Sequence, residues 1–125
     1  MSRTQPKRVI WMGSSRKDVK HFPEDVKDEI GHALWLAQCG EKHITAKPLK
    51  GFGGATVLEI VDDFDTDTYR AVYTVRFEGV VFVLHCFQKK AKRGSATPRA
   101  DMDLIRNRLK DAEALYRKLR QRGEV

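Results

Sequence analysis

The sequence lacks the features that define several common classes of protein. Its two cysteines, Cys39 and Cys86, are too far apart for a C-x-x-C redox pair and too few for a four-cysteine zinc site. We therefore expect two buried or half-buried thiols. No apolar run approaches the ~20 residues of a transmembrane helix, and no apolar segment of a signal peptide follows the basic N-terminus. We expect a cytoplasmic protein with no membrane partner.

Motifs for metal binding and for nucleophilic hydrolysis are also missing. The acidic segment Asp62–Asp67 resembles a calcium loop but lacks its glycine and its terminal glutamate. The four histidines do not have the spacing of zinc ligands. There is no G-x-S-x-G motif, and Gly51–Gly54 lacks the lysine of a phosphate loop and precedes an expected strand. The sequence thus predicts neither a metal site nor a cofactor.

Basic residues are in clear excess, and they are unevenly distributed. Lysine and arginine number 24 against 17 acidic residues, a formal net charge of +7. Twelve of the basic residues and four of the acidic ones lie between Lys89 and Arg122, so the remainder of the chain is nearly neutral. This pattern predicts a polyanionic partner, which is a nucleic acid, an acidic protein or a membrane surface.

The length of 125 residues predicts a single domain over 1–125, with a flexible tail at 1–8. The order of the expected elements indicates an α+β fold, in which helices pack on a three-strand antiparallel meander joined by a short N-terminal strand. These elements are a strand at Val9–Trp11, a helix from Pro23 to Gly40, strands at Val57–Val61, Tyr69–Phe77 and Val80–Phe87, a basic loop at 88–97, and a basic helix opened by Thr97 and Pro98.

A cationic cluster is expected on this meander. Arg70 and Arg76 lie six residues apart, which places both on one face of a regular strand. A tight hairpin brings Arg70 beside the segment His85–Lys90, with Tyr69 and Tyr73 nearby. Such side chains suit metal-free RNA cleavage, which needs proton transfer at the 2′-hydroxyl and the 5′-oxygen and stabilisation of the phosphate. Solvated charges beside a hairpin explain the same spacing equally well.

Five segments, in this order and spacing, resemble the phage-related branch of the RelE/ParE toxin superfamily, close to HigB-type toxins. The resemblance runs from about Trp11 to Leu109. It implies an α+β fold with a twisted antiparallel sheet against N-terminal helices, mRNA cleavage on the ribosome, and neutralisation by a helix-turn-helix antitoxin. The segments are Lys47–Gly54, Val57–Ile60, Tyr69–Tyr73, Val83–Lys90 and Thr97-Pro98.

The resemblance also implies a set of catalytic residues. Arg70 matches the arginine of a Tyr-Arg-x-x-Tyr motif that faces the scissile phosphate in RelE-type toxins. Lys89 and Lys90 match the basic position after the last strand, and His85 and Tyr73 match common family residues. For binding of RNA or the ribosome we expect the surrounding basic residues, namely Lys47, Lys50, Arg76, Lys92, Arg93 and Arg99.

One strand departs from the pattern of RelE itself. Glu59 and Val61 occupy the strand that carries basic catalytic residues there, so that part of the mechanism does not transfer. Glu59 is either a general base or a buried carboxylate paired with an arginine, and we favour the pair. Two other functions stay open at this point: a ParE-like inhibitor of gyrase, and a degenerate, non-catalytic module that binds an antitoxin or nucleic acid.

Overall fold

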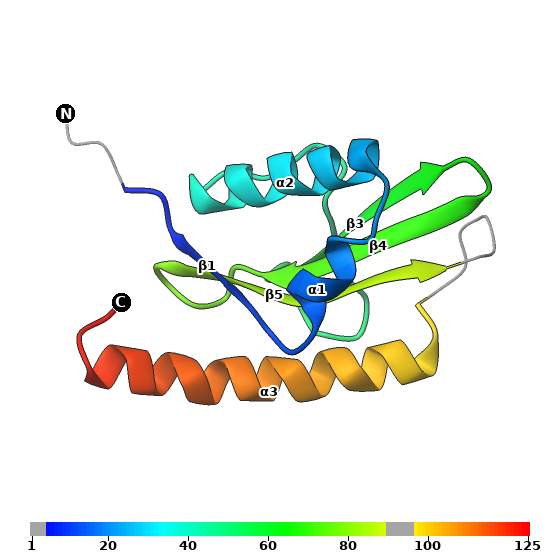
Figure 1. Cartoon of the computed structure of the whole chain (residues 1–125). Helices are drawn as coiled ribbons and strands as arrows, with labels where there is room; N and C mark the ends of the chain where they lie inside the picture. Colours follow the sequence, from blue (N-terminus) through cyan, green and yellow to red (C-terminus); the bar gives the residue numbers. More distant parts are fainter. Residues whose placement is uncertain (1–4, 90–96) are drawn as a thin grey trace.

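A computed structural model describes residues 5–89 and 97–125 of the chain. It contains a five-strand sheet in the order β1-β5-β4-β3-β2, with α2 on one face and α3 on the other (Figure 1). Lys90, Lys92 and Arg93, which the sequence places in the catalytic or RNA-binding sets, lie outside the described residues. The elements are β1 (Arg8–Trp11), α1 (Ser15–Val19), α2 (Glu24–Gln38), β2 (Lys47–Pro48), β3 (Val57–Phe64), β4 (Asp67–Thr74), β5 (Val80–Lys89) and α3 (Arg99–Gln121).

The predicted α+β class and the central meander are confirmed. Strands β3, β4 and β5 pair antiparallel in sequence order, and β5 is buried from Val80 to Cys86 between β1 and β4. Two strands extend this meander. β1 pairs with β5 in the parallel direction. A parallel pair needs a long connection, and most of the chain lies between these two strands. β2 adds two residues beside β3, and Arg8, expected in the tail, belongs to β1.

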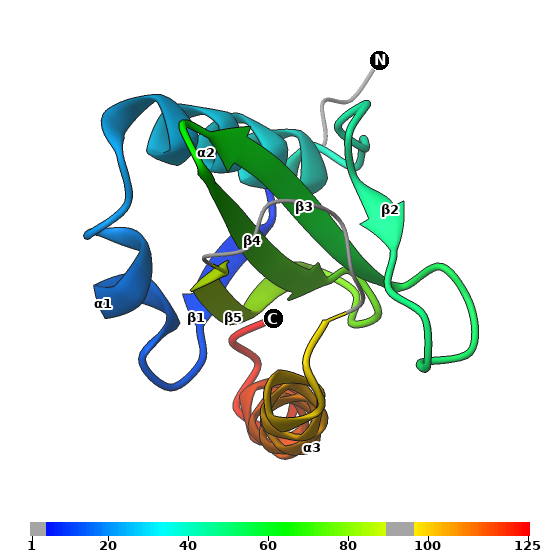
Figure 2. The same cartoon turned by 90° about the vertical axis from the view of Figure 1, so that its right-hand side faces the viewer.

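The sheet lies between α2 and α3 (Figure 2), and a layer of apolar side chains packs on each of its faces. One layer joins the sheet to α2 through buried residues that recur at helical spacing, which include Val26, Ile30 and Leu34. The other joins the opposite face to α3 through Ile105 and Ala112. Successive residues of a strand point to opposite faces, so each residue of β4 belongs to one layer only.

A β-bulge interrupts the pairing of β4 with β5. Val72 pairs with His85, whereas the next residue, Tyr73, pairs with Val83, so Leu84 has no partner on β4. A bulge changes the direction in which the following side chain points. It brings His85 to the α3 face of the sheet, where its ring meets Asp101.

Two further sequence expectations are settled by the element boundaries. Cys86 is buried in β5 as predicted, but Cys39 is exposed, because α2 ends at Gln38 and Cys39 caps it. Burial raises the pKa of the Cys86 thiol to about 12, which makes it a poor nucleophile at neutral pH. None of the helices in residues 5–89 and 97–125 has the length and apolar character needed to cross a membrane.

Candidate active site

Arg70 projects from β4 toward α3, and its contacts include Glu59 and Thr97. Its Nη1 lies 3.6 Å from Oε2 of Glu59 on β3 and donates a hydrogen bond of 3.1 Å to Oγ1 of Thr97, just before α3. The arginine is only 4% exposed. Glu59 is therefore the paired carboxylate that we favoured from the sequence, and it fixes the direction of the guanidinium.

The Glu59 carboxylate is itself in a poorly hydrated position. Burial raises its pKa above the ordinary value, and the charges of Arg70 and then Lys47 partly oppose that shift. Among the described residues its Oε2 accepts no hydrogen bond. Loss of the Arg70 charge would thus leave this carboxylate buried without its counter-ion.

His85 lies diagonally across from Arg70, because Arg70 pairs with Phe87 and Val72 pairs with His85. Its Nε2 lies 2.7 Å from Oδ1 of Asp101 on α3. A carboxylate only accepts hydrogen bonds, so in the neutral ring Nε2 carries the proton and Nδ1 keeps its lone pair. The ring also stacks on Phe87, with centroids 4.6 Å apart.

Arg108 of α3 contacts two other parts of the chain, β5 and the turn before α1. Its Nη1 lies 3.5 Å from Nδ1 of His85 and donates a hydrogen bond of 3.0 Å to the carbonyl oxygen of Leu84. Its Nη2 donates to Oγ of Ser14 at 3.3 Å. Gly13 makes room for this side chain, since a Cβ there would lie 2.6 Å from the guanidinium, and its φ of +53° also favours glycine.

Asp101 and Arg108 are site residues that the sequence analysis missed. They lie on either side of the buried Ile105, four residues before it and three after it, and so interrupt the apolar face of α3. Charged residues on the apolar face of a helix indicate a polar partner in the core. The positions of these two charged residues could be read from the sequence, but only the folded structure identifies His85 as their shared partner.

The exposed basic residues of the predicted RNA-binding set lie around this site. Lys47 pairs with Glu59 across β2 and β3, and Lys50 follows β2. Arg99 is the first residue of α3, and Lys89 pairs with Thr68 at the end of β5. These basic residues thus belong to three elements, β2, β5 and α3, and to the segment that follows β2.

Arg76 and Tyr73 do not join the cluster as predicted. β4 ends at Thr74, so Arg76 lies beyond the strand, where its Nε donates to Oγ1 of Thr56 at 3.2 Å. Tyr73 is an odd number of residues from Arg70 and therefore points to the opposite face, where it is fully buried in the α2 layer. Tyr69 lies on that face too, against Phe22.

Tyr73→Phe should raise the free energy of unfolding by about 1 kcal/mol and leave the activity of the protein unchanged. The Tyr73 hydroxyl is buried, and among the described residues it has no hydrogen-bond partner. Burial also raises its pKa to about 12, which makes it unsuitable for proton transfer near neutral pH. Urea unfolding measures the free energy of unfolding, and a lower value for Tyr73→Phe than for wild type would contradict the prediction.

An open hollow of about 380 Å³ adjoins His85. Its lining combines β5 residues, including Phe87, with Asp18, His21 and Phe22 from α1 and the turn that follows it. His21 donates from Nδ1 to the carbonyl oxygen of Lys17 at 2.9 Å, which leaves its Nε2 as the acceptor. Within the described ranges, no three His, Cys, Asp or Glu side chains are grouped as a metal ion would require.

Comparisons with known proteins give one informative match. The family model of phage-derived Gp49-like proteins matches residues 17–110. Among solved structures, the toxin–antitoxin complex RelBE2 from Mycobacterium tuberculosis is similar with a TM-score of 0.45 and 19% identity, over 72% of this chain and 99% of that chain. No curated protein sequence matches the chain. The family match is the finding on which identification rests.

Proposed function

Because the chain belongs to the phage-derived Gp49-like family, whose members are RelE/HigB-type toxins, we propose that it is the toxin of a toxin–antitoxin pair. Its partner in this proposal is a helix-turn-helix antitoxin. Its activity is endoribonucleolytic cleavage of mRNA on the ribosome, without a catalytic metal ion. The observation that carries the proposed activity is the position of Arg70 and His85, which lie diagonally across from each other on one face of the adjacent strands β4 and β5.

Arg70 is suited to binding the scissile phosphate. Its contact with Thr97 is a hydrogen bond to a neutral hydroxyl, whereas a phosphate would form charge-assisted hydrogen bonds with the same group. Because the Arg70 side chain is only 4% exposed, this step requires the segment before α3 to move away, so that the phosphate replaces Thr97 at Nη1 while Glu59 keeps the guanidinium in place. The guanidinium then stabilises the additional negative charge of the pentacovalent phosphate.

His85 and Lys89 are suited to the two proton transfers. Nδ1 of His85 accepts the proton of the 2′-hydroxyl after Nη1 of Arg108 has moved from its 3.5 Å contact with this nitrogen, and Asp101 stabilises the resulting imidazolium from the other side of the ring. The 2′-oxygen attacks phosphorus, and the bond from phosphorus to the 5′-oxygen breaks. Lys89, two residues beyond Phe87 on the same strand face, donates a proton to that 5′-oxygen. The products are a 2′,3′-cyclic phosphate and a 5′-hydroxyl.

A translation extract programmed with one defined mRNA tests this function. Primer extension should show discrete stops after addition of the protein, and the RNA fragments should carry a 2′,3′-cyclic phosphate and a 5′-hydroxyl. The same mRNA without ribosomes should stay intact. Intact mRNA in both reactions would refute the proposal, and inhibition of gyrase supercoiling by the same preparation would replace it with the ParE-like function.

A further inference from the structure

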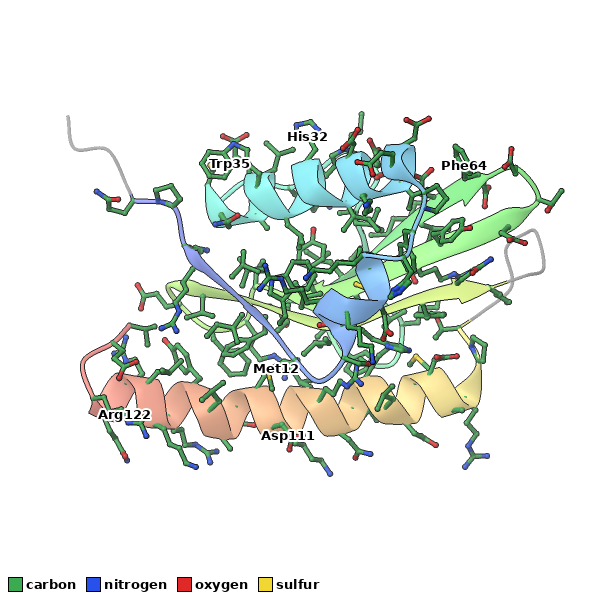
Figure 3. The ribbon with its side chains drawn as sticks, in the orientation of Figure 1. Met12, His32, Trp35, Phe64, Asp111 and Arg122 are labelled. Carbon is green, nitrogen blue, oxygen red and sulfur yellow. The ribbon has the colours of Figure 1, made fainter. Side chains whose placement is uncertain are left out.

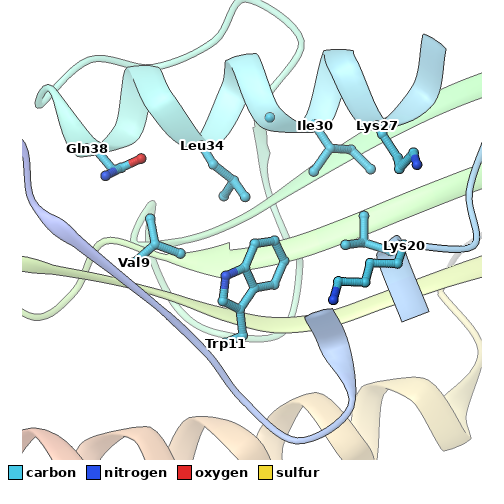
Figure 4. A pocket seen from close by; sticks show the side chains of 9 residues that line it. Val9, Trp11, Lys20, Lys27, Ile30, Leu34 and Gln38 are labelled. Atoms are coloured by element: carbon cyan, nitrogen blue, oxygen red, sulfur yellow. The ribbon is translucent and has the colours of Figure 1, made fainter. Parts of the chain in front are cut away.

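A second open site lies on the other side of the sheet from Arg70, between α2 and the edge strand β1 (Figure 4). This cleft has a volume of about 360 Å³. Val9 and Trp11 of β1 form one wall, and Ile30 and Leu34 of α2 form the other. The mechanism proposed for RNA cleavage uses none of these residues.

The cleft is positively charged at one end. Lys20 and Lys27 line it, and none of the described lining residues is acidic. Lys27 also forms an ion pair of 3.0 Å with Glu24, whose side chain is 80% exposed. An ion pair that is so accessible to water is weak, so Lys27 remains able to meet a carboxylate from outside.

Gly31 lines the same cleft from the middle of α2. Glycine weakens a helix relative to alanine, and here its backbone conformation does not require it, because its φ is not positive. Apart from its chain neighbours and the backbone of its own helix, a Cβ at this position would meet no atom of the described residues within 4 Å. Packing within the chain therefore does not require glycine either, which leaves close approach by another molecule as its use.

Trp35 lies four residues after Gly31 on α2, and its side chain is 50% exposed. Figure 3 shows it on the side of α2 that faces away from the sheet. Exposed tryptophans contribute strongly to protein–protein binding. Of the two tryptophans of the chain, Trp11 lines the cleft and Trp35 does not.

We propose that this cleft binds an apolar, acidic segment of the antitoxin. An apolar side chain of that segment packs against Gly31 and Trp11, and a carboxylate meets Lys20 and Lys27. A protein segment fits better than RNA, because the walls are mostly aliphatic, with one aromatic side chain at Trp11, and only Lys20 and Lys27 are basic among the described lining residues. The inference rests on the proposed toxin function, and it places the antitoxin contact on the face of the sheet opposite Arg70.

Isothermal titration with the helix-turn-helix antitoxin of the proposed pair tests the inference. Gly31→Leu, which fills the cleft, should weaken binding at least about tenfold, and Lys20→Glu should weaken it in a salt-dependent way. Gly31→Ala should raise the thermal midpoint by about 3 °C while it still weakens binding. The matched control Ala114→Leu makes a similar addition at an exposed position of α3 and should bind like wild type.

Binding should also change the fluorescence of Trp11 and Trp35. If wild type binds and Gly31→Leu binds equally well, the cleft is not the contact, and the proposed toxin function stands. If wild type does not bind this protein at all, the inference and the antitoxin part of the proposed function both fail. Cleavage of mRNA is measured separately and does not depend on either result.

Discussion

Arg70→Lys should keep the fold and reduce mRNA cleavage at least about a hundredfold. Lysine preserves a positive charge beside Glu59, but its single ammonium group cannot hold the carboxylate and a phosphate in the fixed geometry of a guanidinium. Cleavage of a defined mRNA in translation extract measures the activity, and the thermal midpoint measures whether the fold is kept. The control is Arg76→Lys, which makes the same change beyond the end of β4 and should cleave like wild type.

Arg70→Ala should lose cleavage more completely but also about 2 kcal/mol of stability, because it leaves Glu59 buried without its counter-ion. Adding Glu59→Gln removes that unpaired charge and should restore much of the stability without restoring cleavage. Full activity of Arg70→Lys, or activity that returns with stability in the double variant, would show that Arg70 has a structural role only.

Asp101→Asn should reduce cleavage about a hundredfold or more, because the amide no longer holds the proton on Nε2 of His85 or stabilises its imidazolium. Asp101 touches no substrate in the proposed mechanism and acts by positioning His85. Asp101→Glu, which keeps the carboxylate, should recover part of the activity.

The matched control for this change is Asp103→Asn, two residues later on α3. Asp103 has a side chain that is 60% exposed and forms a surface pair with Arg106 at 3.4 Å, so its variant should cleave like wild type. Equal losses of cleavage activity in the two variants would mean that the net charge of α3, and not the orientation of His85, determines the activity. Thermal melting of each variant separates a folding defect from lost catalysis.

Local patterns in the sequence were sufficient for the meander and for the neighbours of Arg70. The apolar run Val80–Phe87 predicted a strand, which the structure extends to Lys89 as β5. The tight hairpin placed Arg70 beside the His85–Lys90 segment, and the register of β4 and β5 confirms this for residues up to Lys89. The resemblance to RelE/HigB-type toxins is confirmed by the family match. These features depend on residues close together in the chain.

Features that depend on distant residues were predicted less well. The parallel pairing of β1 with β5 involves strands separated by most of the chain, and no local signal encodes its direction. Asp101 and Arg108 gain their meaning only from His85, which the bulge at Leu84 turns toward α3. The placement of Tyr73 was wrong, although the two-residue period of a strand already assigns it to the face opposite Arg70.

The central claim is that the chain cleaves RNA through the 2′-hydroxyl of the substrate. The most direct measurement uses two otherwise identical mRNAs, one of which carries a single 2′-deoxynucleotide on the 5′ side of the mapped cleavage position. The ribonucleotide mRNA should be cut by the ribosome-bound protein, and the deoxy-substituted mRNA should stay intact at that position. Cleavage of both mRNAs at the same position would contradict the proposed chemistry and the roles assigned to Arg70 and His85.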